Sequence, residues 1–145
     1  MQDGQQRASY PVVLAPAIDG VRLTLHVLAA AVWVGGQLTM AGLLGTVRQL
    51  GDDAPRRVAR AFGRLSWPAY AVLIGTGIWN VVAAGGEQRS AWKAVLSLKI
   101  VVALLAGLAA LLHSRAKSRA GLAVWGSVAG SASLAALVLG VFLAG

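Results

Sequence analysis

Long stretches of apolar residues, separated by short polar or charged segments, dominate this chain. Four stretches reach the length of about 20 residues that an α-helix needs to cross the hydrocarbon core of a bilayer. They run approximately over residues 21–47, 67–84, 92–113 and 122–144. Because lipid offers the backbone no hydrogen-bond partners, each stretch is expected to be helical. The pattern therefore predicts an all-α fold, an integral membrane bundle of four transmembrane helices.

The polar segments suggest where these helices begin and end. Residues 1–18 are expected to form a short exposed tail, and residues 19–145 a single membrane domain with Asp19 as the N-cap of its first helix. After a turn at residues 51–55, apolar residues recur at helical spacing among four arginines over residues 56–67. This segment predicts a basic amphipathic lead-in at the lipid headgroups, continuous with the second span through a bend near Pro68.

Composition and charge agree with a membrane protein. Hydrophobic residues make up 57% of the chain and charged residues only 12%, whereas soluble domains carry about 25% charged residues. The net charge of +8 does not indicate a nucleic-acid partner, because the basic residues lie between the apolar stretches and not on a folded module. They gather after the first and third stretches, which places those two loops in the cytoplasm and both termini outside the plasma membrane.

Two ionisable side chains lie inside the predicted spans, and each is a candidate functional residue for that reason. His26 is six residues into the first helix and Lys99 seven residues into the third. Both helices enter from the outer side, so the two groups are expected about 9–10 Å deep in the outer leaflet. If their helices pack together, both side chains can face one cavity.

Helical periodicity places each candidate on a face that mixes polar and small residues, as expected for a bundle interior. On the first helix this stripe holds His26, Ala30, Trp33, Gln37 and Met40; on the third it holds Trp92, Lys99, Ala106 and His113. A structural alternative stays open for each group. His26 can hydrogen-bond Thr76 across the bundle, Lys99 can extend its ammonium to the headgroups, and His113 can lie at the cytoplasmic edge. Trp33 and Met40 can simply pack in the core.

The pattern formed by several of these residues resembles that of a known protein family. The His26…Trp33-Val34-Gly35-Gly36 segment is similar to the opening of the copper-resistance protein D (CopD-like) membrane domain. Three further blocks agree in order: Arg60-x-x-Gly63-Arg64-Leu65-Ser66, Gly75-Thr76-Gly77, and the third-helix start from Ser90 to Lys99. The resemblance covers about residues 20–120 and implies copper homeostasis, possible contact with a periplasmic copper-binding partner, and a copper site. His26, Met40 and His113 are its candidate metal ligands, since imidazole and thioether both bind copper.

A second resemblance points to a different cofactor. HemJ-type protoporphyrinogen oxidases, small four-helix membrane proteins, similarly pair a first-helix His, followed seven residues later by Trp, with a third-helix Lys. The resemblance implies haem b, with His26 as axial ligand, Lys99 as a second ligand or propionate partner, and Trp33 beside the cofactor.

Three hypotheses follow from the sequence: a CopD-like copper protein with its site near His26, a haem-b-binding redox protein, and an accessory membrane subunit without a ligand. The chain has no cysteine, which excludes disulfides, thiolate metal sites and cysteine nucleophiles. It also lacks the motifs of hydrolytic enzymes and phosphate-binding loops, so a HemJ-like oxidoreductase is the only enzymatic alternative. Neither cofactor nor oligomeric state is decided by the sequence.

Overall fold

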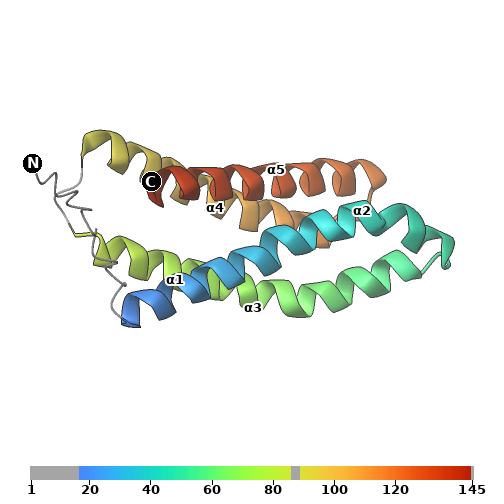
Figure 1. Cartoon of the computed structure of the whole chain (residues 1–145). Coiled ribbons are helices and arrows are strands. Elements are labelled where there is room, and N and C mark those ends of the chain that lie inside the picture. Colours follow the sequence, from blue (N-terminus) through green and yellow to red (C-terminus); the bar gives the residue numbers. More distant parts are fainter. Residues whose placement is uncertain (1–16, 86–88, 145) are drawn as a thin grey trace, which may run out of the picture.

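The computed structural model describes residues 17–85 and 89–144, and nearly all of them are helical (Figure 1). The first helix comprises α1, a short π-helical segment η1, and α2, which follow one another without a break. The others are α3, α4 and α5. The bounds are α1 Ala17–Ala30, η1 Ala31–Gly35, α2 Gly36–Gln49, α3 Ala54–Ala83, α4 Ser90–Arg115 and α5 Arg119–Ala144.

Four helices of this described part are long and apolar enough to cross a membrane. They contain 33, 30, 26 and 26 residues, each more than the roughly 20 that a bilayer requires. Leucine and valine side chains cover much of their outer surface, as expected for contact with lipid. The all-α, four-helix membrane fold expected from the sequence is confirmed.

The start of the first helix differs from the expectation. Because α1 includes Ala17, Asp19 lies within the first turn and is not the N-cap. Its carboxylate accepts a hydrogen bond of 2.9 Å from Arg22, one turn further along the same helix. The predicted tail falls outside the described residues except for Ala17 and Ile18, which are helical.

A π-helical turn interrupts the first helix, which the periodicity had predicted to be regular. It spans Ala31–Gly35 and contains the buried Trp33 and Val34. A π turn holds one extra residue, so side chains on either side of it no longer share one α-helical stripe. His26 accordingly contacts α3, whereas the indole Nε1–H of Trp33 reaches α5 and donates to Ser133 Oγ over 3.0 Å.

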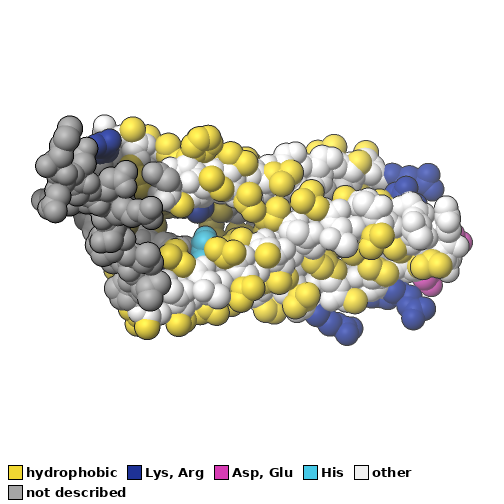
Figure 2. All heavy atoms as spheres, in the orientation of Figure 1, with side chains coloured by type: hydrophobic (Ala, Val, Ile, Leu, Met, Phe, Trp, Pro, Cys, Tyr) yellow, Lys and Arg dark blue, Asp and Glu magenta, His cyan; other side chains and the backbone are white. Residues whose placement is uncertain are grey.

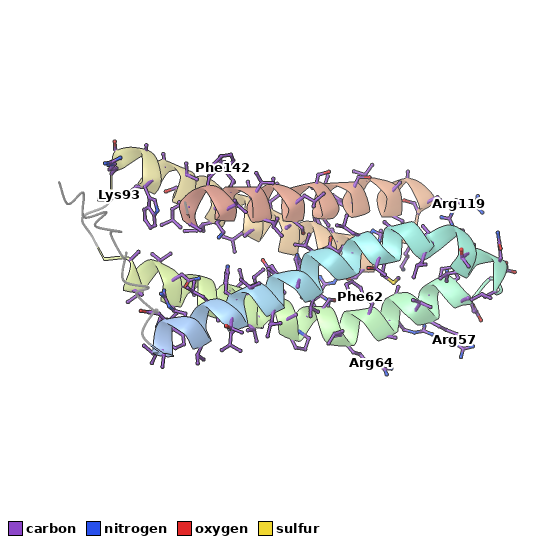
Figure 3. The ribbon with its side chains drawn as sticks, viewed as in Figure 1. Arg57, Phe62, Arg64, Lys93, Arg119 and Phe142 are labelled. Atoms are coloured by element: carbon purple, nitrogen blue, oxygen red, sulfur yellow. The ribbon has the colours of Figure 1, made fainter. Side chains whose placement is uncertain are left out.

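The arginine-rich lead-in and the second span form one helix, α3, as expected. Pro68 lies inside it. Proline has no N–H to donate to the carbonyl one turn earlier, but the helix continues on both sides. Phe62 of the lead-in contacts Gly36 of α2, and Figure 3 shows its ring between the two helices. This part of the lead-in therefore packs against the first helix.

The helices pair into two antiparallel hairpins, one of α1–α2 with α3 and one of α4 with α5 (Figure 1). Aromatic residues join the hairpins near their middle. Within the first hairpin, the ring centroid of Trp33 lies 4.5 Å from that of Tyr70 and 5.7 Å from that of Trp67, both on α3. The Tyr70 hydroxyl donates to the Ala103 carbonyl of α4 over 3.0 Å, in addition to the Trp33–Ser133 bond to α5. Each bond satisfies a polar group of the interior while it ties one hairpin to the other.

The charges are distributed unequally between the two ends of the bundle. The end that holds the α2–α3 and α4–α5 connections carries most of the basic side chains, which Figure 2 shows in dark blue. In Figure 3, Arg57, Arg64 and Arg119 belong to this end, and Lys93 lies at the opposite one. The two basic loops of the sequence are therefore on the same side of the bundle.

The contact between Tyr70 and Gly107 gives a test of how the hairpins join. A Cβ added at Gly107 would overlap the Tyr70 ring, so Gly107→Ala is expected to force the hairpins apart and to destabilise the protein by about 1–3 kcal/mol. The matched control is Gly130→Ala, where a Cβ meets nothing within 4 Å. Thermal unfolding in detergent measures both. Equal unfolding temperatures for the two variants would contradict this packing.

Candidate functional site

His26 is held by a hydrogen bond between two helices. Its Nδ1 lies 2.8 Å from Thr76 Oγ1 of α3. The Thr76 hydroxyl carries one proton, which it donates to its own helix, at 2.7 Å from the Val72 carbonyl and 3.2 Å from the Leu73 carbonyl. With its proton used in this way, the hydroxyl accepts from the imidazole, and Nδ1 carries the hydrogen.

This arrangement decides the chemistry that a neutral His26 can offer. With the proton on Nδ1, the lone pair is on Nε2, which makes no hydrogen bond within the described part of the chain. Histidine ligands of metals commonly have this form: one nitrogen donates to a fixed acceptor and the other binds the metal. The hydrogen bond to Thr76, which the sequence offered as a structural alternative, is present. It nevertheless leaves Nε2 of His26 free to bind a metal.

Lys99 lies across from His26 on the other hairpin. Its Nζ packs close to Gly140 of α5, where a Cβ would be only 2.9 Å away. It is partly buried and makes no hydrogen bond or ion pair with any described residue. It is also near enough to His26 for the two groups to interact electrostatically. The two ionisable residues selected from the sequence therefore interact through space, without a hydrogen bond between them in the described part of the chain.

Small residues let these two side chains lie close to neighbouring helices. Gly77 lies against the imidazole, where a Cβ would be 3.7 Å from Cε1 of His26, and Gly140 lies against Lys99. Figure 2 shows a hollow between the two hairpins, with a histidine and a basic side chain inside it. The hollow lies towards the end of the bundle opposite the main group of basic side chains.

Two further polar residues of this region were not selected as site residues from the sequence. Arg22 is one turn before His26, and Asn80 is one turn after Thr76. The Nε of Arg22 and the Oδ1 of Asn80 are buried and have no hydrogen-bond partner in the described structure. Spacing could have revealed them, since residues four apart share one face of a helix.

The remaining candidates lie elsewhere. Trp33 is 4% exposed; its ring packs on Tyr70 of α3, and its Nε1–H bonds Ser133 of α5. His113 lies at the opposite end of α4, where its Nδ1 is 2.9 Å from the Leu122 carbonyl. It follows Lys99 by 14 residues, or about 21 Å of helix. Met40 follows His26 by the same number of residues. The structure therefore does not bring His113 or Met40 to His26.

No metal-binding group of three or more His, Cys, Asp or Glu side chains occurs within residues 17–85 and 89–144. The candidate site consists instead of one imidazole with a free nitrogen and two nearby cationic side chains, Lys99 and Arg22. Among the described residues, the only carboxylate paired with either cation is that of Asp19, 2.9 Å from Arg22. Such an arrangement can coordinate a single metal atom through His26 and attract an anionic group.

Comparisons with family models, curated proteins and solved structures found no match to this chain. The resemblances to CopD-like and HemJ-type proteins therefore stay predictions from the sequence.

The bond between His26 and Thr76 is tested by removal of its acceptor. Thr76→Val keeps the shape but leaves Nδ1–H without the hydroxyl, and should lower the free energy of unfolding by about 1 kcal/mol. Thr39→Val is the control, since the Thr39 hydroxyl bonds only the Gly35 carbonyl of its own helix, at 2.8 Å. Unfolding in mixed micelles is the measurement. In a His26→Phe background the Thr76→Val effect should largely disappear, and an unchanged effect there would contradict the bond.

Proposed function

We propose that this membrane protein binds haem b between its two hairpins, with Nε2 of His26 as an axial ligand of the iron. The observation that carries the proposal is the 2.8 Å contact between His26 Nδ1 and Thr76 Oγ1, from which we infer that the hydrogen is on Nδ1 and the lone pair on Nε2. The similarity of the His26, Trp33 and Lys99 pattern to HemJ-type proteins supports the same ligand.

The charges around His26 favour haem over a copper ion. Lys99 and Arg22 are cations, and a further cation beside them would be repelled in a medium of low dielectric constant. Haem b instead carries two propionates, which these side chains attract. A copper ion would also need additional ligands, and the described residues that were expected to supply them, Met40 and His113, lie about 21 Å along their helices from this position.

The residues around the site fit such a group in their chemistry. An imidazole is a common axial ligand, and Gly77 and Gly140 let the side chains of His26 and Lys99 lie against α3 and α5. Bound haem would supply one-electron redox chemistry. The chain's own part is to fix the imidazole through Thr76, to neutralise the anionic groups, and to surround the site with apolar helices that limit access of water.

We further propose that the basic end of the bundle faces the cytoplasm and that the site lies in the outer half of the plasma membrane. Eight of the Lys and Arg residues lie at the basic end: Arg48, Arg56, Arg57, Arg60, Arg64, Arg115, Lys117 and Arg119. Cytoplasmic loops carry such an excess of positive charge.

The absence of cysteine from the chain makes this orientation simple to test. A single cysteine in place of Ser90, at the start of α4, should react with a membrane-impermeant maleimide on intact cells. A single cysteine in place of Ser118, between α4 and α5, should react only after the cells are opened. The opposite labelling pattern would invert the proposed topology.

Haem binding is tested by titration of the detergent-purified protein with haemin. We expect a Soret band shifted from that of free haemin, which His26→Ala abolishes because the axial ligand is lost. His113→Ala is the matched control and should keep the band, since His113 lies at the other end of the bundle. Copper binding by a colourless protein, reduced in His26→Ala, would instead support the copper hypothesis. Binding of neither ligand would favour an accessory subunit.

A further inference from the structure

Two buried polar atoms near His26 have no hydrogen-bond partner among the described residues. One is a donor and the other is an acceptor. The guanidinium of Arg22 uses Nη2 to bond Asp19, but its Nε–H has no acceptor within the described part of the chain. The Oδ1 of Asn80 has no donor. An unsatisfied buried polar group costs about 1–3 kcal/mol, more when it is charged, so such atoms commonly indicate a missing partner.

The antiparallel pairing of α1 and α3 places these residues next to each other. The His26–Thr76 bond fixes which turns of the two helices face one another. One turn from it in the same direction, α1 presents Arg22 and α3 presents Asn80, each on the face of the bonded residue. The two side chains do not hydrogen-bond each other, so each of the two atoms still lacks a partner in the described structure.

The charge of Arg22 determines which kind of ligand group binds beside these two atoms. The side chain of Arg22 is 12% exposed and that of Asp19 is 37% exposed, so the carboxylate is the more hydrated member of the pair. The unpaired Nε–H of Arg22 is thus a buried donor that belongs to a charged group. Rotation of the Asn80 amide about its last torsion angle exchanges its oxygen and its NH2 group, so Asn80 can also donate. Two donors, one of them cationic, suit a carboxylate.

We propose that Arg22 and Asn80 form a carboxylate-binding subsite for a hydrophobic ligand whose other end is at His26. The inference rests on the proposed function in one respect, namely that the ligand is a porphyrin. It adds the group by which the protein holds that ligand: a propionate accepts hydrogen bonds from Arg22 Nε and the Asn80 amide. Iron coordination by His26 and carboxylate binding by Arg22 are separable contributions, because they involve different atoms of the ligand.

The test uses metal-free protoporphyrin IX, whose binding does not depend on coordination by His26. Its affinity for the full-length protein in detergent is compared with that of its dimethyl ester, which lacks the negative charges. We expect the acid to bind about tenfold or more tightly than the ester, measured by fluorescence quenching. Arg22→Gln should reduce this preference to near unity and should lower the affinity for the acid while leaving that for the ester unchanged.

Controls separate the subsite from a general effect of charge and from misfolding. Arg89→Gln removes one exposed arginine from the connection before α4 and should keep the preference for the acid. Arg22→Lys keeps the charge but lacks Nε, and should show an intermediate preference. An unchanged affinity for the ester demonstrates that each variant is folded.

The outcomes distinguish this inference from the proposed function. Equal affinity of acid and ester for the wild-type protein, or an acid preference that survives Arg22→Gln, would overturn the subsite; the two unpaired atoms would then be bridged by water. If haemin nevertheless gives the Soret band that depends on His26, the proposed function stands without the subsite. An acid preference that depends on Arg22, without a Soret band that depends on His26, would support the subsite and contradict haem ligation. Failure of every porphyrin to bind would overturn both.

Discussion

The hydrogen bond between His26 and Thr76 is the interaction on which the proposed site depends. It satisfies a polar ring inside a membrane helix, where an unpaired group is costly. It also sets the tautomer, because the threonine proton is already used by backbone carbonyls of α3. The same contact fixes how α1 and α3 are aligned, and this alignment brings Arg22 beside Asn80. The alignment of α1 with α3, the form of the His26 imidazole and the position of Arg22 relative to Asn80 thus all depend on this one bond.

The remainder of the bundle supports an opening next to that bond. Trp33 and Tyr70 join the two hairpins near their middle, through bonds to Ser133 and the Ala103 carbonyl. Towards the end that holds His26 and Lys99, the hairpins separate around a hollow (Figure 2). Trp33, within the π turn, packs on α3 and bonds α5, whereas the hydrogen bond of His26 is to α3 alone among the described helices. A rigid centre beside an open end is well suited to hold a ligand in a fixed orientation.

The helices and the pairing of His26 with Lys99 could be predicted from the sequence, whereas the finer features of the site could not. Apolar length fixes the spans, and equal depth in the outer leaflet indicated that the two ionisable groups could meet. The π turn has no periodicity signal of its own, so Trp33 was expected on the stripe of His26. Asp19 was expected as an N-cap because the helix was thought to begin later. The role of Arg22 and Asn80 depends on how α1 and α3 align, which a single helix pattern does not contain.

The protonation of His26 is the most direct test of this account, and the chain contains only two histidines. Nitrogen-15 NMR of the histidine-labelled protein, assigned with a His113→Gln variant, distinguishes a protonated ring nitrogen from one with a free lone pair. The account predicts a neutral His26 with its hydrogen on Nδ1 and an unprotonated Nε2. A spectrum with the hydrogen on Nε2, or with both nitrogens protonated near neutral pH, would contradict it.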